Sequence, residues 1–250
     1  MLKGSLVALV TPFYLDGGVD YDTLGGLIEY HLQSNTDGFV ILGTTGEAAT
    51  MSFEERLELL RFIMKHLPKG MSVVASGHTA DELDRQIYEA NAFINEGIDA
   101  YVFIANRLAK QDEDDSVFLR NYEKMVSSIP EIGLGVYECP YPYKRLMAPE
   151  TLRQCALDGR LKFLKDTCCQ IGQIEAKLKA VEGLGLKIYN ANSATLLESL
   201  RAGCAGFSGV MANFHPELYS WLCKNYKTIF KRYQNSYTRH ISTFKESATY

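Results

Sequence analysis

The sequence predicts a (β/α)8 TIM barrel followed by a short C-terminal helical segment. Short apolar runs alternate with segments of helical periodicity at a nearly even step, and eight such units fit within 250 residues. This alternation is typical of a parallel sheet, and eight units in this length favour a closed barrel over an open doubly wound sheet. No G-x-G-x-x-G follows the first apolar run, which argues against a dinucleotide-binding sheet. We expect the barrel over residues 1–215, with a helix and tail over residues 216–250 packed on it.

Eight buried strands are indicated by apolar runs that end at polar or small residues. Continuous apolar runs, rather than alternating ones, are typical of parallel strands that are covered on both faces. The predicted strands are 6–10, 38–43, 72–77, 100–105, 132–137, 161–165, 186–189 and 206–210.

Helices are predicted between these strands from apolar residues spaced three and four positions apart. The clearest start is the capping box at 52–55, which opens a helix that extends to about His66. Gly97 is a typical C-terminal stop, and the acidic run at 112–115 suits the start of the next helix. The predicted helices are 24–32, 53–66, 81–94, 117–126, a segment from 149, 174–181, 194–202 and 216–233.

The composition is that of an ordinary soluble globular protein. The chain is 46% hydrophobic and 22% charged, with a net charge of -4. Mild acidity without a basic stripe argues against a nucleic-acid partner, and no apolar run reaches the roughly 18 residues that a membrane span needs. The N-terminus lacks a signal-peptide pattern and the six cysteines lack zinc-type spacing. We therefore expect a cytoplasmic protein with reduced thiols.

The strand at 161–165 ends in a lysine, although its other inward positions are apolar. Alternation predicts that Leu161, Phe163 and Lys165 share one face, while Lys162 points to the opposite side. Burial disfavours the charged form of a lysine, so its pKa falls and free amine becomes available at neutral pH. Free amine is what a Schiff-base nucleophile needs. The alternative interpretation is a strand-end lysine that reaches solvent.

Two other strand ends complete a site, because a barrel places its chemistry at the C-terminal ends of its strands. Tyr137 ends the fifth strand, and its phenol can both donate and accept a proton. Thr44 and Thr45 follow the second strand in a turn that begins at Gly43, and such turns suit a carboxylate. The alternatives are a satisfied core tyrosine and an ordinary βα turn.

The other strand ends give weaker signals. Asn192 follows the seventh strand, and Ser208 and Val210 lie at the end of the eighth; all three are predicted to bind substrate. His78, after the third strand, is expected to be a loop or capping histidine rather than a base. Acidic clusters with metal-ligand spacing are absent from the strand ends, which predicts no metal and disfavours a metal-dependent aldolase.

These motifs together resemble the dihydrodipicolinate synthase / N-acetylneuraminate lyase superfamily. The similarity rests on the GTTGE sequence at 43–47, the strand-five Tyr137 and the KDT sequence at 165–167, and it extends from about residue 6 to residue 216. The resemblance implies a class I aldolase or lyase that acts on pyruvate or a similar 2-oxo acid without a cofactor. It also implies that Lys165 forms the Schiff base, Tyr137 relays protons, and Thr44 and Thr45 hold the substrate carboxylate.

The sequence departs from this family where the aldehyde partner binds. The synthases carry a tyrosine after the fourth strand and an arginine shortly after the strand-five tyrosine. This chain has Asn106 and Arg107 in the first region and Glu138 in the second, and we predict that these residues determine specificity. The alternatives are 4-hydroxy-tetrahydrodipicolinate synthase proper, with Lys144, Arg145 or Arg107 in place of the arginine, and a non-catalytic paralogue that binds a 2-oxo acid. The resemblance further implies a homo-oligomer, either a dimer or a tetramer.

Overall fold

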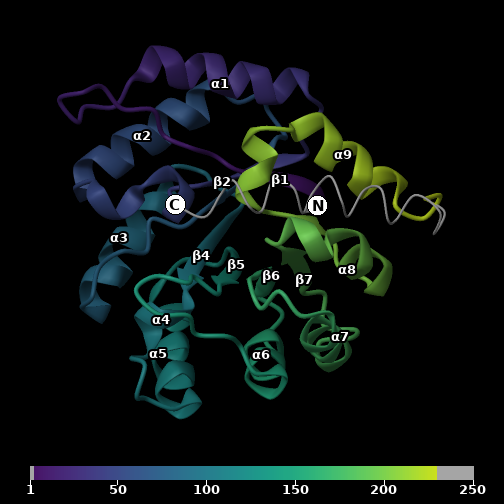
Figure 1. Ribbon diagram of the computed structural model, residues 1–250. Coiled ribbons are helices and arrows are strands. Elements are labelled where there is room, and N and C mark those ends of the chain that lie inside the picture. The colour runs from purple at the N-terminus through teal and green to yellow at the C-terminus, as the bar shows by residue number, and fades with distance from the viewer. Residues whose placement is uncertain (1–2, 230–250) are drawn as a thin grey trace.

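Eight parallel strands close into a barrel at the centre of the molecule (Figure 1). The structure is a computed structural model that describes residues 3–229. Each strand pairs with the next along the chain, and the eighth pairs back with the first, so the predicted TIM barrel is confirmed. The strands are β1 (Gly4–Ala8), β2 (Gly38–Ile41), β3 (Ser72–Ala75), β4 (Ala100–Ile104), β5 (Gly133–Tyr137), β6 (Leu161–Asp166), β7 (Lys187–Asn190) and β8 (Gly206–Phe207).

Helices surround the barrel on its outside (Figure 1). The predicted capping box at the start of α2 is confirmed, because the Ser52 hydroxyl and the Glu55 carboxylate each accept the other's backbone N–H. A single-turn helix, α4, directly follows β4 and was not predicted. The helices are α1 (Tyr21–Gln33), α2 (Phe53–His66), α3 (Leu83–Asn95), α4 (Ala105–Leu108), α5 (Asp115–Ser128), α6 (Pro149–Ala156), α7 (Ile171–Ala180), α8 (Leu196–Ala202) and α9 (Pro216–Asn225).

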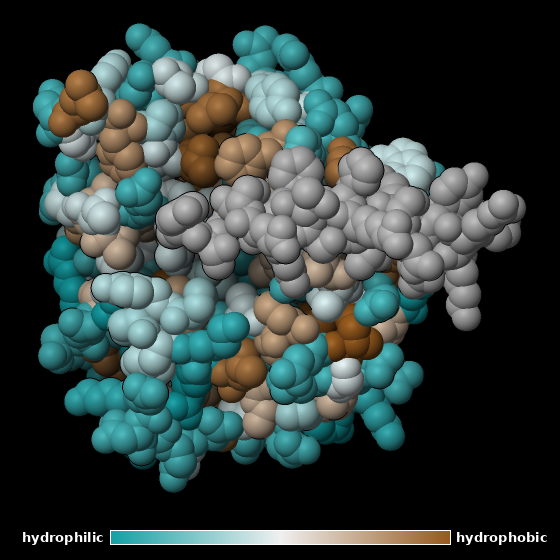
Figure 2. All heavy atoms as spheres, viewed as in Figure 1, coloured by the Kyte–Doolittle hydropathy of each residue, from teal (hydrophilic) through white to brown (hydrophobic). Residues whose placement is uncertain are grey.

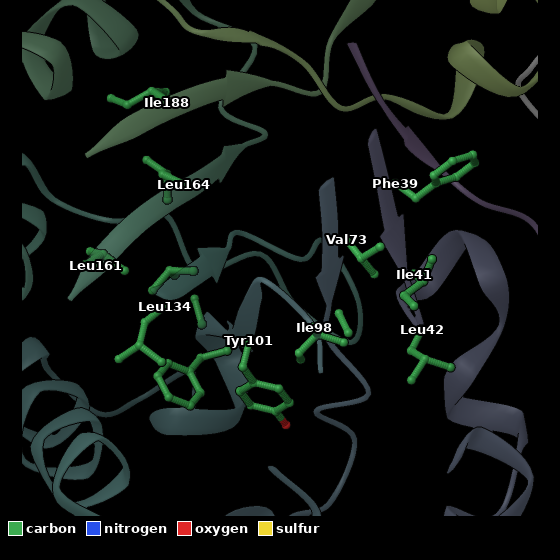
Figure 3. Packing of buried hydrophobic residues seen from close by; sticks show 14 of the residues in the cluster. Phe39, Ile41, Leu42, Val73, Ile98, Tyr101, Leu134, Leu161, Leu164 and Ile188 are labelled. Atoms are coloured by element: carbon green, nitrogen blue, oxygen red, sulfur yellow. The ribbon is translucent and has the colours of Figure 1, made fainter. Parts of the chain in front are cut away.

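The buried side chains form two clusters, one on each side of the strands. The inner cluster fills the barrel with residues such as Val40, Val102 and Phe163. The outer cluster lies between strands and helices, and Figure 3 shows part of it. Burial on both faces explains why the strands appear in the sequence as continuous apolar runs. Hydrophilic residues cover most of the periphery of the face shown in Figure 2.

Strand β6 departs from strict alternation. Leu161 and Leu164 both belong to the outer cluster (Figure 3), while Phe163 belongs to the inner one. The pairing with β5 shifts by one residue at this point, and Lys162 is the extra, exposed residue. The prediction that Leu161 shares a face with Lys165 is therefore wrong, because a bulge inserts one residue into the alternation. Phe163 and Lys165 do lie on the same, interior side.

Helix α9 is the eighth barrel helix, the one that follows β8. Leu222 belongs to the outer cluster, and the Tyr219 ring stacks on Phe207 of β8 at 4.3 Å between centroids. The boundary predicted after residue 215 thus falls inside the last βα unit. The helix ends at Asn225 rather than Tyr233, because Thr228 donates its N–H and hydroxyl to the Asn225 carbonyl three residues back. Residues 230–250, and with them the predicted tail, lie outside the described residues.

Candidate active site

The amine of Lys165 lies against the ring of Tyr137 inside the barrel. The two residues are direct partners in the β5–β6 pair, so their side chains leave the sheet at the same level. Lys165 Nζ is 4.5 Å from the centroid of the Tyr137 ring. Lys165 is 6% exposed and Tyr137 is 8% exposed. The structure therefore brings together the two residues that the sequence predicts as nucleophile and proton relay.

Burial shifts the pKa values of Lys165 and Tyr137 in directions that suit Schiff-base chemistry. It lowers the pKa of Lys165 to about 8, against a smaller opposing effect of Cys139. At pH 7 roughly a tenth of a group with this pKa is unprotonated, far more than for an exposed lysine. Burial, followed by the Cys139 thiol, raises the pKa of Tyr137, while a hydrogen bond with Thr44 lowers it. The phenol thus stays protonated at neutral pH and can donate a proton beside a reactive amine.

Thr44 reaches the same site from the turn after β2. Gly43 is extended, and Thr44–Gly46 then form one turn of 3-10 helix whose first N–H groups have no partner within the helix. The Thr44 hydroxyl oxygen is 3.2 Å from the Cys139 sulfur. Leu42 and Glu47 bracket the turn in the left-handed region, with φ of 54° and 56°. For non-glycine residues this conformation costs about 1–3 kcal/mol and is found mainly at functional sites.

Cys139 is a site residue that the sequence interpretation did not assign. Its thiol belongs to the inner cluster, together with Tyr137, and contacts Thr44. A signal was present in the sequence, because Cys139 follows Tyr137 by only two positions and so stays close to the same strand end.

Glu138, between them, points the other way and is fully buried with 0% exposure. Its carboxylate accepts the ammonium of Lys177 at 2.5 Å and the backbone N–H groups of Met147 and Thr167 at 2.8 and 3.0 Å. Both oxygens of this carboxylate already have protein partners, so the side chain is engaged within the protein, and its predicted role in choosing the aldehyde stays a prediction.

Glu138, Asp166 and Lys177 form a buried ionic triad beside the strand ends that carry Tyr137 and Lys165. Lys177 Nζ also lies 2.6 Å from the Asp166 carboxylate. Burial lowers the pKa of Lys177, but the two carboxylates outweigh it, so the pKa is raised and the ammonium persists. Burial raises the pKa of Glu138, and Lys177 opposes this effect. Because Glu138 follows Tyr137 and Asp166 follows Lys165, the triad anchors both strand ends.

Asn106 and Arg107 are engaged in holding loops. Arg107 is ion-paired with Asp81. The Asn106 amide donates to three carbonyls of the loop after β5, those of Cys139, Tyr141 and Tyr143, at 3.2, 2.9 and 2.5 Å. The amide oxygen of Asn106 is buried and has no hydrogen-bond partner among the described residues. Asn106 therefore shapes the loop that carries Cys139, whereas the Arg107 side chain is tied to Asp81.

The three substrate-binding residues predicted near the ends of β7 and β8 differ in whether their side chains are already hydrogen-bonded. Asn192 caps the next helical turn through its oxygen, which accepts two backbone N–H groups, and its nitrogen donates to the Cys169 sulfur at 2.9 Å. Ser208 is fully buried, and its hydroxyl has no partner among the described residues. Val210 is 47% exposed and begins a short 3-10 turn rather than ending β8. Ser208 is the one of the three with an unused polar group.

His78 is a structural residue and gives a testable acid response. Its Nε2 is 2.8 Å from the Gln86 amide oxygen, and its Nδ1 accepts the N–H of Ile104 at 2.8 Å. Burial lowers its pKa from 6.5 to about 4. The unfolded chain thus binds a proton that the folded protein does not bind between these values, so stability falls as pH falls through this window, by about 3 kcal/mol.

We expect His78→Asn, whose side-chain oxygen can still accept the Ile104 N–H, to flatten this acid response. Urea unfolding of both proteins at pH 7 and pH 4.5 checks it. His31, whose pKa is also lowered to about 4, is present in both proteins and cancels in the comparison. An unchanged difference between the two pH values in the variant would contradict the assignment.

A cavity of about 480 Å³ lies at the opposite, N-terminal end of the barrel, where Lys162 and Lys187 line it with Asp99. None of the candidate site residues lines it, and TIM barrels use their C-terminal face for catalysis. Within residues 3–229, no group of three or more His, Cys, Asp and Glu side chains is arranged to hold a metal ion. No helix in that range has the length and apolar character required to cross a membrane.

Comparisons with known proteins agree with this geometry. The chain matches the model of the dihydrodipicolinate synthetase family over residues 1–241. It is 32% identical over 225 residues to the 4-hydroxy-tetrahydrodipicolinate synthase of Neisseria gonorrhoeae and 30% identical over 226 residues to that of Saccharophagus degradans. Each alignment covers 90% of this chain and 75% of the relative.

A solved structure shares the fold closely. The chloride-inhibited dihydrodipicolinate synthase from Acinetobacter baumannii, in complex with pyruvate, superposes with a TM-score of 0.88 at 25% identity. The superposition covers 98% of this chain and 82% of that one. From its sequence and its fold alike, this chain belongs to the dihydrodipicolinate synthetase family and is an enzyme of the carbon–carbon lyase class.

Proposed function

We propose that the protein is a Schiff-base aldolase that makes or breaks a carbon–carbon bond between pyruvate, or a similar 2-oxo acid, and an aldehyde. The observation that carries this proposal is the buried Lys165 amine, with its pKa lowered to about 8, against the ring of a protonated Tyr137. An ammonium group at a buried, otherwise apolar strand end does not stabilise the fold, since burying a charge is costly. Covalent catalysis explains why the amine is there.

In the proposed reaction, Lys165 Nζ attacks the carbonyl carbon of the 2-oxo acid and water leaves, so that a protonated imine links enzyme and substrate. The departing hydroxyl needs a proton, which the Tyr137 phenol supplies. The iminium nitrogen withdraws electrons, so a C3 proton is lost and an enamine forms. The enamine carbon then adds to the aldehyde, and hydrolysis of the new imine releases the product. Cleavage follows the same steps in reverse, and no further cofactor is required.

The 2-oxo acid carboxylate has a proposed binding place at the turn after β2. Gly43, Thr44 and Thr45 offer backbone N–H groups and hydroxyls there, and hydrogen bonds from such turns favour an anion. The unpartnered Ser208 hydroxyl is a further donor that we propose contacts the substrate. Asn192 and Val210 are proposed to line the same region, Asn192 through its backbone since its side chain is engaged in a cap.

Replacing Tyr137 with phenylalanine is expected to slow turnover by about 10²- to 10⁴-fold, because the ring stays while the proton donor is lost. The measurement is the consumption of pyruvate with a panel of aldehydes, which also tests the proposed function itself. Tyr141→Phe, in the exposed part of the same loop, is the matched control and should react as the wild type does. If the Tyr137→Phe enzyme turns over every aldehyde at the wild-type rate, the Tyr137 phenol takes no part in the mechanism.

The second candidate is 4-hydroxy-tetrahydrodipicolinate synthase proper. The names of the relatives favour it, and so does Lys144, whose ammonium donates to the Thr167 carbonyl two residues beyond Lys165. Arg107 and Arg145 are already paired with Asp81 and Asp115, so Lys144 is the cation we propose for a second carboxylate. Formation of a cyclic product from pyruvate and aspartate semialdehyde distinguishes this candidate. A reaction with other aldehydes alone would exclude it.

We also propose a cytoplasmic homo-oligomer, a dimer or tetramer, that binds neither nucleic acid nor membrane. The six unpaired cysteines support a reducing compartment, because disulfides are rare there. The proposed oligomeric state rests on the family resemblance. Light scattering on the purified protein measures this state directly.

A further inference from the structure

The thiol of Cys139 lies where the polar groups of the site meet. Its sulfur is 3.2 Å from the Thr44 hydroxyl oxygen, and it donates to the Tyr141 carbonyl at 3.3 Å. The side chain belongs to the inner cluster with Tyr137 and is 3% exposed. Cys139 also acts electrostatically on both catalytic groups, since it raises the pKa of Lys165 and of Tyr137. A buried thiol that interacts with nucleophile, phenol and hydroxyl together has more than a packing role.

The loop around Cys139 is built to hold this position. The Asn106 amide fixes the Cys139 carbonyl and two further carbonyls of the same loop. The Cys139 N–H donates to the Tyr137 carbonyl at 2.9 Å, which closes a tight turn directly after β5. These bonds keep the sulfur against Thr44, while the thiol itself contacts the Tyr141 carbonyl of its own loop and the Thr44 hydroxyl.

We propose that Cys139 carries the proton that the Tyr137 phenol exchanges while the substrate iminium and enamine form, through the contact that the Thr44 hydroxyl makes with its sulfur. The inference rests on the proposed function and deepens it. Cys139 acts through Tyr137 and Thr44 and does not itself touch the substrate, so it is a positioning residue for protons and not a nucleophile.

The proton balance of this step closes without another reactant. When the phenol gives its proton to the departing hydroxide, water leaves and the Thr44–Cys139 pair returns a proton to the phenolate. The thiol becomes a thiolate, which the charge on the nearby iminium nitrogen favours. Loss of the C3 proton then forms the C2=C3 bond and neutralises the nitrogen, and that proton passes back through Tyr137 to the thiolate. No atom is oxidised or reduced.

The test measures proton exchange apart from carbon–carbon bond formation. Pyruvate and enzyme in D2O, without any aldehyde, exchange the C3 protons for deuterium through the enamine, and proton NMR follows the rate. Borohydride trapping on the same samples measures how much iminium forms on Lys165. The variants are Cys139→Ala, which removes the proton carrier, and Cys139→Ser, which keeps a hydroxyl near Thr44. Cys139→Val replaces the alanine variant if alanine leaves the site unable to fold.

A matched control is Cys155→Ala, which deletes another buried thiol. Cys155 lies on α6, outside the site, and burial raises its pKa to about 12. Its loss should lower the melting temperature without changing the exchange rate.

We expect Cys139→Ala to slow deuterium exchange by about 10- to 100-fold, with a smaller loss for Cys139→Ser. When borohydride is added after enzyme and pyruvate have reached equilibrium, both variants should give wild-type amounts of trapped iminium, because a proton carrier changes rates and not equilibria. Exchange within twofold of the wild type in Cys139→Ala would overturn the inference. Parallel loss of trapped iminium and of exchange would also overturn it, because the thiol would then merely hold the site together. A wild-type enzyme that traps no pyruvate at all would refute the proposed function instead, so the two failures are distinguishable.

Discussion

Replacing Lys165 with methionine is expected to abolish carbon–carbon bond chemistry while making the protein more stable. Methionine keeps most of the apolar stem and removes the amine, so no iminium can form. Loss of a covalent nucleophile lowers turnover by at least about 10³-fold, because the remaining groups have no electron sink to act on. The assay is pyruvate consumption or release with whichever aldehyde the wild type uses.

The gain in stability follows from the pKa of the same group. Burial lowers the pKa of Lys165 from 10.5 to about 8, so the unfolded chain holds the proton more tightly than the folded protein does. This penalty is fully present below pH 8 and disappears as pH rises toward 10.5. It amounts to about 3 kcal/mol, which sets the largest stabilisation to expect at pH 7 from Lys165→Met. The stabilisation should shrink when unfolding is measured near pH 10.

Lys162→Met on the same strand is the matched control. Lys162 is exposed at the N-terminal end of the barrel, so both activity and stability should stay near wild-type values, within about 0.5 kcal/mol. An active Lys165→Met enzyme would contradict the assignment of the nucleophile. A variant that is inactive but less stable than the wild type would show that burial of the Lys165 amine does not destabilise the folded protein.

Replacing Lys177 with methionine is expected to cost about 3–5 kcal/mol of folding stability. The change leaves Glu138 and Asp166, both fully buried, without the ammonium that lies 2.5 and 2.6 Å from them. Removing one partner of a buried ion pair leaves uncompensated charge, which has this effect in proteins generally. The variant should recover part of its stability at lower pH, where the orphaned carboxylates take up protons. Urea unfolding at pH 7 and pH 5 measures both effects.

The same change should disturb catalysis, because the triad anchors the residues that follow Tyr137 and Lys165. We expect turnover to fall in the fraction of Lys177→Met that remains folded, whereas Lys179→Met, on the exposed side of α7, should behave as the wild type does. A fully stable Lys177→Met protein would show that the triad is not a structural anchor. A double variant in which Glu138 becomes glutamine as well should regain stability, because one buried charge is then removed.

The sequence predicts the barrel well because its signals are local. Eight apolar runs, helical spacing between them and the capping box at Ser52 each report on a few neighbouring residues, and a closed parallel sheet is the arrangement that buries them all. Lys165, Tyr137 and Thr44 could be placed together for a related reason. The C-terminal ends of parallel strands meet at one face of a barrel, so position along each strand fixes the level of the side chain.

The sequence predicts less where contacts join distant residues. The partner of Glu138 is Lys177, 39 positions away, and no local pattern identifies such a pair. The spacing of Ile174, Lys177 and Val181 does place the lysine on the buried side of its helix, which was a usable signal. The bulge at Lys162 also escaped prediction, because the sequence of residues 161–165 fits a regularly alternating strand as well as a strand with one inserted residue.

Borohydride reduction in the presence of pyruvate, followed by peptide mass mapping, identifies the lysine that forms the Schiff base. Reduction converts an iminium into a stable secondary amine on the lysine that formed it. We predict a single pyruvate adduct, on Lys165, lost in Lys165→Met and retained in Lys162→Met. A folded protein with no adduct, or with the adduct on another lysine, would contradict the assignment of Lys165 as the Schiff-base nucleophile of this enzyme.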